Sequence, residues 1–395
     1  MVEAGVKPAI TLFHWDTPLA LFNSYGAWTD PRIIDDYFNY ATYVISRYDE
    51  HVPVWFTFNE PQYCNWQYMQ YPAGNEKGNY PAYHNITGGL EARIACSHYT
   101  ILAHAKVAKW YHEDFKGKGR ITFKNSGNYF EANSTSPEDL DSVARNYEFV
   151  LGWFAGCWRD GDYSPMLKET LGSMLLNFTQ EEKDLIAGSC DFFAIDPYTA
   201  YYAYGLPDGS AACAANSSDP NFPECAGSTA TAPDGFPIGP AADYGVSWLK
   251  TTPAAVRRFL NKIPELFPAV PDIVVSEFGF AEPYEGEGTD LGYILWDLRR
   301  ADYIQSFLDN ILTAKLVDGV NVTGAFGWAI FDNFEWFAGS RVKFGLQYVN
   351  QTSLERVPKA SMFQFLDWFK LHGGATVEGA SNIGNASAIP NVGSG

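Results

Sequence analysis

The stretch Trp-Phe-Thr-Phe-Asn-Glu-Pro at residues 55–61 is an apolar run that ends in a carboxylate, and Ile-Val-Val-Ser-Glu-Phe-Gly at residues 273–279 has the same arrangement. An unbroken run of β-branched and aromatic residues predicts a strand buried on both faces, as in a parallel sheet. A charge at the end of such a strand lies where the chain leaves the core. In parallel α/β folds this edge carries the active sites. Glu60 and Glu277 are therefore candidates for a pair of catalytic carboxylates.

Short apolar runs alternate with longer amphipathic stretches along the whole chain. Strands are predicted at residues 8–13, 53–58, 120–124, 191–195, 272–276 and 323–329. Helices are predicted at residues 33–48, 90–115, 137–154, 253–263, 293–316 and 360–371. This alternation indicates an α/β fold with a parallel sheet and right-handed crossovers. Six units are too few for a closed eight-stranded barrel and enough for an open doubly wound sheet, and periodicity does not choose between them.

The charge balance limits the possible partners. The 395 residues carry 27 basic and 46 acidic side chains, a net charge of −19, so nucleic acid and an anionic membrane surface would be repelled. No apolar run approaches the roughly 18 residues that a membrane span needs. Aromatic residues make up 16% of the chain, and aromatic faces commonly line ligand pockets. We expect a small-molecule partner, no nucleic acid, no membrane, no metal and no cofactor.

Asn-X-Ser/Thr acceptor sites point to an extracellular protein. Seven of them occur, at Asn85, Asn133, Asn177, Asn216, Asn321, Asn350 and Asn385. The first residues lack the apolar segment of a signal peptide. We nevertheless expect a secreted protein that carries N-glycans.

The six cysteines permit up to three disulfides. Cys213 and Cys225 lie in a Ser/Pro/Asn/Ala-rich stretch and are predicted to form a bridge, which would contribute about 3 kcal/mol. Cys96 and Cys190 lie in helix or strand patterns and are predicted to be buried thiols. Cys64 and Cys157 stay unassigned.

Several longer motifs carry a family resemblance. They are Phe-His-Trp-Asp at 13–16, Thr-Phe-Asn-Glu-Pro at 57–61, Asp-Asn-Phe-Glu-Trp at 332–336 and Lys-Phe-Gly-Leu at 343–346. Supporting matches occur at residues 152–154, 161–163, 178–182, 237–240 and 358–359. In this order they resemble the signature runs of glycoside hydrolase family one, the β-glucosidase family, in a fungal-like secreted form.

The resemblance implies a fold and a reaction. The fold would be a (β/α)8 TIM barrel, and the reaction a retaining hydrolysis of terminal non-reducing β-D-glucosyl residues from cellobiose, aryl or alkyl β-glucosides or short oligosaccharides. Glu60 would be the general acid and base, and Glu277 the nucleophile. Tyr198 stands where the family has a tyrosine that donates a hydrogen bond to the nucleophile. Retention predicts that the two carboxyl groups lie about 5 Å apart.

The resemblance also implies the residues that hold the sugar. His14, Asn59 and Glu335 would bind its hydroxyl groups, and Asn59 would reach the 2-hydroxyl. Trp328 would form the floor, and Trp336 would add an indole N–H donor. The remaining contacts would come from Phe344 on the far side of the sugar and from Trp248 against the leaving group.

The sequence departs from the family pattern in three ways. The first two strand–helix units of the family, with a sugar-binding glutamine and an arginine beside the nucleophile, have no counterpart here. We therefore expect residues 1–395 to form one barrel domain that is incomplete at its N-terminal side, with exposed strand edges and poor hydrolysis of aryl β-glucosides. Residues 374–395 are predicted to be a flexible tail. Asp196 replaces a usual asparagine and adds a charge near Glu277, and Lys343 replaces a common arginine.

Other functions compete with a β-glucosidase. The chain could be a catalytically impaired sugar-binding remnant, or a galactosidase or fucosidase of the same family. A 6-phospho-β-glycosidase would need cations near the sugar 6-position, where Glu335 stands. Myrosinase-like chemistry would lack the acid carboxylate, and Glu60 is present.

Overall fold

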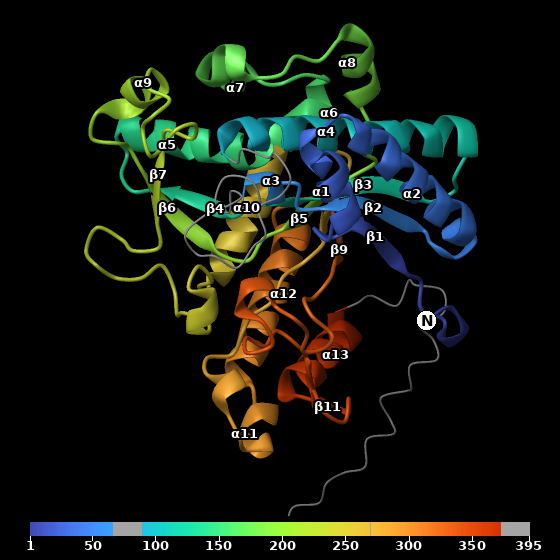
Figure 1. Ribbon diagram of the computed structural model, residues 1–395. Helices are drawn as coiled ribbons and strands as arrows, with labels where there is room; N and C mark the ends of the chain where they lie inside the picture. The colour runs from blue at the N-terminus through green and yellow to red at the C-terminus, as the bar shows by residue number, and fades with distance from the viewer. Residues whose placement is uncertain (66–88, 269, 373–395) are drawn as a thin grey trace, which may run out of the picture.

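The computed structural model describes residues 1–65, 89–268 and 270–372, and its centre is a six-stranded parallel sheet (Figure 1). The strands are β1 (Ala9–Phe13), β2 (Val54–Asn59), β3 (Arg120–Ser126), β5 (Phe193–Asp196), β8 (Ile273–Val275) and β9 (Val322–Ala325), in this spatial order. Every strand pairs in parallel with the preceding one in the sheet. All six predicted strands are thus confirmed. Within the described residues β1 and β9 pair with one strand each, so these strands alone do not close a barrel.

Long helices connect the strands. They are α2 (Arg32–Tyr48), α4 (Leu90–Lys109), α5 (Pro137–Tyr147), α10 (Pro253–Leu266), α12 (Leu298–Leu316) and α13 (Ala360–His372). In Figure 1, α12 packs between α10 and α13, and α2 packs beside α4. The α/β class predicted from the alternation is therefore correct.

Three predicted helices are interrupted. The stretches 90–115 and 137–154 continue into π-helical turns at Trp110–Phe115 and Glu148–Gly156. The stretch 293–316 is divided into α11 (Leu291–Leu295) and α12, because the buried Asp297 between them accepts hydrogen bonds from Arg300 and Ser361. The tertiary ion pair outweighs helix continuity at this point.

Shorter elements complete the chain. The short helices are α1 (Leu19–Tyr25), α3 (Tyr63–Asn65), α6 (Cys157–Asp160), α7 (Pro165–Leu171), α8 (Gln180–Ile186) and α9 (Gly209–Ala214). The strands β4 (Tyr129–Ala132), β6 (Ala200–Tyr204) and β7 (Gly227–Thr229) form a second sheet, and β10 (Gln347–Val349) pairs with β11 (Arg356–Pro358). A capping box between Thr179 and Glu182 begins α8, which explains one family motif by local hydrogen bonding.

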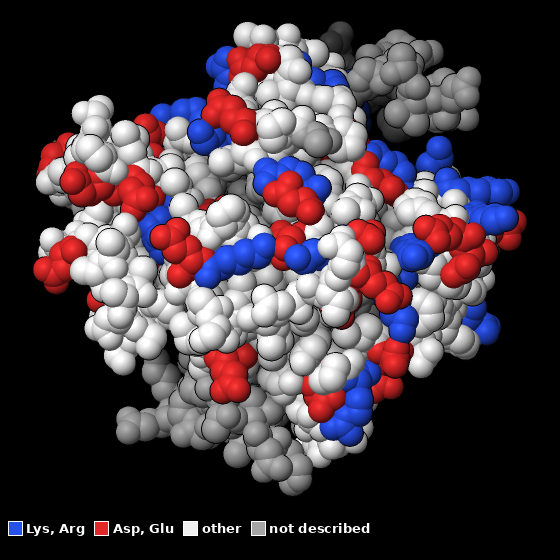
Figure 2. Space-filling view, turned by 90° about the horizontal axis from the view of Figure 1, so that it is seen from above, with Lys and Arg blue, Asp and Glu red and all other residues white. Residues whose placement is uncertain are grey.

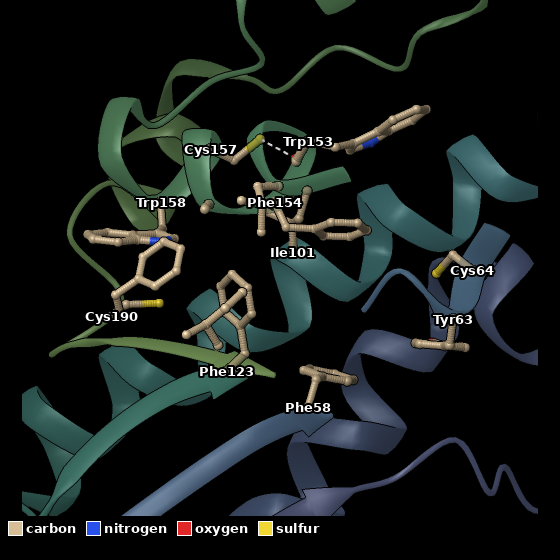
Figure 3. Close-up of a cluster of buried hydrophobic side chains, with 14 of the residues drawn as sticks. Phe58, Tyr63, Cys64, Ile101, Phe123, Trp153, Phe154, Cys157, Trp158 and Cys190 are labelled. Atoms are coloured by element: carbon tan, nitrogen blue, oxygen red, sulfur yellow. Dashed lines mark hydrogen bonds between the residues drawn. The ribbon is translucent and has the colours of Figure 1, made fainter. Parts of the chain in front are cut away.

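The main core lies between the strands and the helices outside them. Figure 3 shows Phe58 on β2 and Phe123 on β3 on the side of the strands that faces Ile101 of α4 and Trp158 of α6. A smaller cluster of Phe56, Phe192, Ala194 and Val274 forms separately. Burying each large apolar side chain contributes about 1.5–3 kcal/mol. Helix packing on one face of the strands leaves their carboxyl ends free to carry polar groups.

The cysteines confirm two predictions and correct a third. Cys213 and Cys225 form the predicted bridge, and Cys190 is a buried free thiol, as is Cys157. The prediction that Cys96 is a free thiol is wrong, because it pairs with Cys64. The turn after Glu60 places Cys64 in α3 against the first turns of α4, an approach that the sequence does not reveal.

Figure 2 shows basic and acidic side chains interspersed over the face it presents. No described helix is both long enough and apolar enough to span a bilayer. The predicted tail at 374–395 and the acceptor sites Asn85 and Asn385 lie outside the described residues.

Replacing Cys64 and Cys96 together by alanine is expected to lower the free energy of unfolding by about 4 kcal/mol, because the bridge closes a 32-residue separation. Urea unfolding measures this loss. The amide of Tyr63, which donates to the Glu60 carbonyl oxygen at 2.9 Å, should also exchange faster with solvent. Replacing Cys213 and Cys225 is the matched control, and it should cost about 3 kcal/mol without changing exchange at Tyr63. Equal exchange in both variants would show that the Cys64–Cys96 bridge does not hold the Glu60 turn.

Candidate active site

Glu60 lies directly beyond β2, and its carboxyl group is buried. Its backbone N–H still donates to the Lys124 carbonyl oxygen at 2.9 Å, so the chain remains paired with β3. A register shift between Phe56 and Asn59 precedes it, and its φ of 43° is unusual for a residue with a side chain. Burial, followed by the charges of Asp196 and Glu277, raises the pKa of Glu60 well above its usual value. These effects favour the protonated form of Glu60.

Glu277 lies at the same edge of the sheet, two residues beyond β8, and its side chain is also buried. The hydroxyl of Tyr198 donates to its Oε2 at 2.9 Å. The ammonium group of Lys124 donates to its Oε1. Two donors therefore stabilise the ionised form of this carboxylate, whereas burial favours the protonated form of Glu60.

Tyr198 reaches Glu277 because the strand pair is interrupted at this point. β3 and β5 pair up to Ser126 and Asp196, and β4 and β6 resume the pairing at Tyr129 and Ala200. In the gap, Oδ1 of Asn128 accepts hydrogen bonds from the backbone N–H groups of Tyr198, at 3.3 Å, and Thr199, at 3.0 Å. The amide side chain replaces the missing ladder bonds, so the backbone can turn without leaving buried donors unpaired.

Lys124 is the site residue that sequence reasoning missed. Its ammonium group donates to Oδ1 of Asn59 at 2.6 Å and to Glu277, and it lies 3.5 Å from Oδ2 of Asp196. Burial opposes its charge, but Asp196, Glu277 and Glu60 outweigh that effect and raise its pKa. The same pattern that indicated Glu60, a charged residue at the end of an apolar run, is also present at Lys124.

Asp196 adds a further buried carboxyl group at the end of β5. It accepts a hydrogen bond from the Ser276 hydroxyl at 2.6 Å. Burial raises the pKa of Asp196 to about 8, with Glu277 acting in the same direction and Lys124 in the opposite one. The carboxyl group of Asp196, which stands where the family usually has an asparagine, also contributes to the raised pKa of Glu60.

His14 and Asn59 lie together at the ends of β1 and β2. Nε2 of His14 and Nδ2 of Asn59 are 3.2 Å apart, and the indole N–H of Trp15 donates to the Asn59 carbonyl oxygen at 3.0 Å. Burial lowers the pKa of His14, which keeps the ring neutral. A neutral imidazole can exchange hydrogen bonds with a sugar hydroxyl as donor or acceptor.

Trp328, Glu335 and Trp336 reach the same site from the segment after β9. The rings of Trp328 and Trp336 lie 5.4 Å and 5.7 Å from that of His14. Burial raises the pKa of Glu335 to about 7, although a hydrogen bond from Trp328 opposes this effect. Two residues at this site, Glu60 and Trp336, have positive φ values, as does Trp15 beside them, and backbone strain of this kind concentrates at functional sites.

Phe344 and Trp248 pack around the ring of Tyr198. Their rings lie 6.4 Å and 5.6 Å from that of Tyr198, both close to perpendicular. Phe344 is buried, whereas Trp248 is 41% exposed. The structure therefore brings together all ten site residues that the sequence indicated.

A close backbone contact positions the Trp328 segment. The Trp328 N–H donates to the Phe278 carbonyl oxygen at 2.8 Å. A Cβ atom on Gly279 would lie only 2.0 Å from the Trp328 carbonyl oxygen, so glycine is required there. This contact fixes the distance between the segment after β8 and the segment that carries Trp328.

A buried ion cluster supports the same segment from behind. Lys359 donates to Oδ1 of Asp332 at 2.7 Å and pairs with Glu285 at 2.5 Å. Arg300 pairs with Glu285 and Asp297 and donates to the carbonyl oxygens of Phe280, at 2.8 Å, and Lys343, at 2.7 Å. Losing one member would leave a buried charge uncompensated, which costs about 3–5 kcal/mol.

Comparison with known proteins agrees with this geometry. The model of the glycosyl hydrolase family 1 matches residues 1–373. The chain belongs to this family. Beta-glucosidase 12 of Oryza sativa subsp. indica is 33% identical over 380 residues, which cover 94% of this chain and 71% of the relative. Beta-glucosidase 1B of Phanerodontia chrysosporium is 34% identical over 382 residues, 94% and 67% of the two chains.

Solved structures of the family show the same fold. A family 1 β-glucosidase of the fungus Humicola insolens, solved in complex with glucose, superposes with a TM-score of 0.84 at 30% identity. The match covers 94% of this chain and 76% of that structure. The six parallel strands are therefore strands of a family 1 (β/α)8 barrel, and the alternative of an open doubly wound sheet is wrong.

The Tyr198→Phe variant is expected to lower kcat/KM for aryl β-glucosides by roughly 10- to 100-fold, because it removes a hydrogen bond to a charged group. Steady-state kinetics and a thermal melt measure the effect. Tyr25→Phe is the matched control. It also removes a tyrosine–carboxylate hydrogen bond, the one of 2.5 Å to Asp36, but this bond is exposed to solvent. Equal kinetics for the two variants would contradict a role of Tyr198 at the nucleophile.

Proposed function

We propose that this protein is a retaining β-glucosidase that releases terminal β-D-glucosyl residues from cellobiose and from aryl or alkyl β-glucosides. One observation carries the proposal. Burial and the neighbouring carboxyl groups raise the pKa of Glu60, whereas Glu277 accepts hydrogen bonds from Tyr198 and Lys124 within the same buried cluster. A retaining glycosidase needs this division between an acid and a nucleophile.

In the first step, Glu277 attacks the anomeric carbon while Glu60 transfers its proton to the glycosidic oxygen. The bond between the anomeric carbon and that oxygen breaks, and the aglycone leaves as a neutral alcohol. The glucosyl group is then an ester of Glu277, and Glu60 is a carboxylate. The neutral ester removes a negative charge from the surroundings of Glu60, which stabilises its ionised form.

In the second step, Glu60 takes a proton from water as the water oxygen attacks the anomeric carbon. The ester bond breaks and Glu277 regains its negative charge. Two inversions at one carbon give net retention of configuration. Tyr198 and Lys124 stabilise the returning carboxylate through the hydrogen bonds already described.

The glucosyl group would be held by hydroxyl contacts to His14, Asn59 and Glu335 and by the face of Trp328, with an indole N–H from Trp336. The spacing of these rings around His14 supports the assignment. Phe344 and Trp248 would contact the far side of the sugar and the leaving group. Glucose in the related Humicola insolens structure supports a monosaccharide of this kind.

We also infer that the protein is secreted and carries N-glycans. Two disulfides in the described residues support an oxidising compartment. The acceptor residues Asn177, Asn216 and Asn321 are exposed, as glycosylation requires.

The kcat/KM for alkyl β-glucosides is expected to fall as pH rises through the raised pKa of Glu60, because the first step needs its proton. The Glu60→Gln variant should lose this basic limb together with most of its activity. A dinitrophenyl glucoside, whose leaving group needs no proton, should suffer far less from the substitution. Equal losses with both substrates would assign the acid role elsewhere.

The Glu277→Gln variant should lower kcat by at least about a thousandfold, since it lacks the nucleophile. Proton NMR of the first-formed sugar should show the β-anomer with the wild-type protein. An α-anomer would contradict retention. Glucose binding by calorimetry without turnover would instead favour a sugar-binding protein, and faster hydrolysis of a galactoside or fucoside would reassign the substrate.

A further inference from the structure

We propose that Lys124 is a positioning residue of this site: its ammonium group keeps the carboxylate of Glu277 ionised and ties it to the amide of Asn59. The inference rests on the proposed function, since it assumes that Glu277 is the nucleophile. It adds to the reaction a cation that projects from β3, between the strands that carry the two glutamates.

The backbone fixes where Lys124 stands. Its Cα pairs with that of Asn59 on β2 and with that of Ala194 on β5. Its carbonyl oxygen accepts the hydrogen bond from the Glu60 N–H. Lys124 is only 4% exposed. Its ammonium group therefore cannot be hydrated by bulk solvent and needs partners within the site.

The groups around Lys124 are almost all acidic or neutral. Glu60 and Asn59 face it from β2, Asp196 from β5, and Glu277 with Ser276 from beyond β8. His14, at the end of β1, is a neutral neighbour of Asn59, and the charge of Lys124 contributes to lowering the pKa of His14.

Lys124 is the cation that pairs with Glu277. Among the described residues it is the one lysine or arginine within ion-pair distance of Glu277. Without it, an ionised Glu277 would be a buried charge with no counter-ion, and protonation would be the less costly state.

Asp196 gives Lys124 a second partner during the reaction. When Glu277 becomes a glucosyl ester it loses its negative charge, which lowers the pKa of Asp196 and favours its ionised form. Oδ2 of Asp196 lies 3.5 Å from the ammonium group and has no hydrogen-bond partner among the described residues. A small rotation of the lysine end group moves its charge from one carboxylate to the other, so the cation stays in place for the second step.

Covalent trapping of Glu277 tests the role of Lys124. The probe is 2-deoxy-2-fluoro-β-glucosyl fluoride: its fluoride leaves with little help from an acid, and it lacks the 2-hydroxyl that Asn59 would bind. The mass increase of the intact protein is followed over time from pH 4 to 9. In Lys124→Met, the pH at which trapping falls to half on the acidic side should rise by about one to three pH units, and trapping at pH 5 should slow by at least about tenfold.

Lys124→Arg keeps the charge and should restore most of the rate and the wild-type midpoint. Lys106→Met is the matched control, because it removes a surface lysine that pairs with Asp35, and it should behave as the wild type. An unchanged midpoint in a folded Lys124→Met protein, or faster trapping, would overturn the proposal. Absence of trapping in the wild type would contradict the proposed function instead.

NMR of the protein labelled with 15N-lysine tests the contact without relying on activity. The ammonium signal of Lys124, assigned as the one missing in Lys124→Arg, should be protected from exchange and should shift in Glu277→Gln. An unchanged signal in Glu277→Gln would show that the ammonium group does not hold this carboxylate, whether or not the enzyme turns over. This measurement also decides the matter if Lys124→Met does not fold.

Discussion

One ammonium group compensates a set of buried acidic side chains, and the site depends on this balance. Glu60, Asp196 and Glu277 converge at the carboxyl ends of β2, β5 and β8, where each is at most 7% exposed. Buried carboxylates cannot all stay ionised at such close range. Glu60 and Asp196 respond with raised pKa values, while Glu277 is stabilised by Lys124 and Tyr198. Chemically identical side chains thus have different surroundings: burial favours the protonated form of Glu60, whereas Glu277 is hydrogen-bonded to a cation.

The rest of the fold keeps these groups at fixed positions. Parallel pairing brings the strand ends to one edge, and helix packing on the outer face leaves that edge available. Asn128 satisfies the interrupted ladder that aims Tyr198, and Gly279 permits the close approach of the Trp328 backbone. The ion cluster of Arg300, Glu285, Asp332 and Lys359 holds the aromatic segment from behind. Rigid support of this kind keeps reacting groups aligned.

Local patterns were enough to predict the six strands and the edge that carries Glu60 and Glu277, because burial on both faces leaves a clear apolar run. Two features of the structure could not be predicted from local patterns. Lys124 ends a strand in the same way as Glu60, but a lone lysine shows its role only when the three carboxyl groups around it are known. Cys96 was taken for a buried thiol, because its partner Cys64 is brought near by the turn after Glu60. The division between α11 and α12 likewise follows from the contacts of Asp297 with Arg300 and Ser361.

The sequence by itself determined the α/β class, the order of the strands along the chain and, through its motifs, the family, with Glu60 and Glu277 as the candidates for a catalytic pair. These are properties of residue order, since hydrophobic periodicity and motif spacing are written along the chain. The tertiary structure decided which carboxyl groups have raised pKa values, which cation faces Glu277 and that Cys64 pairs with Cys96. These depend on distance and burial between residues that lie far apart in sequence, as Lys124 and Glu277 do, and electrostatic energies follow spatial separation alone.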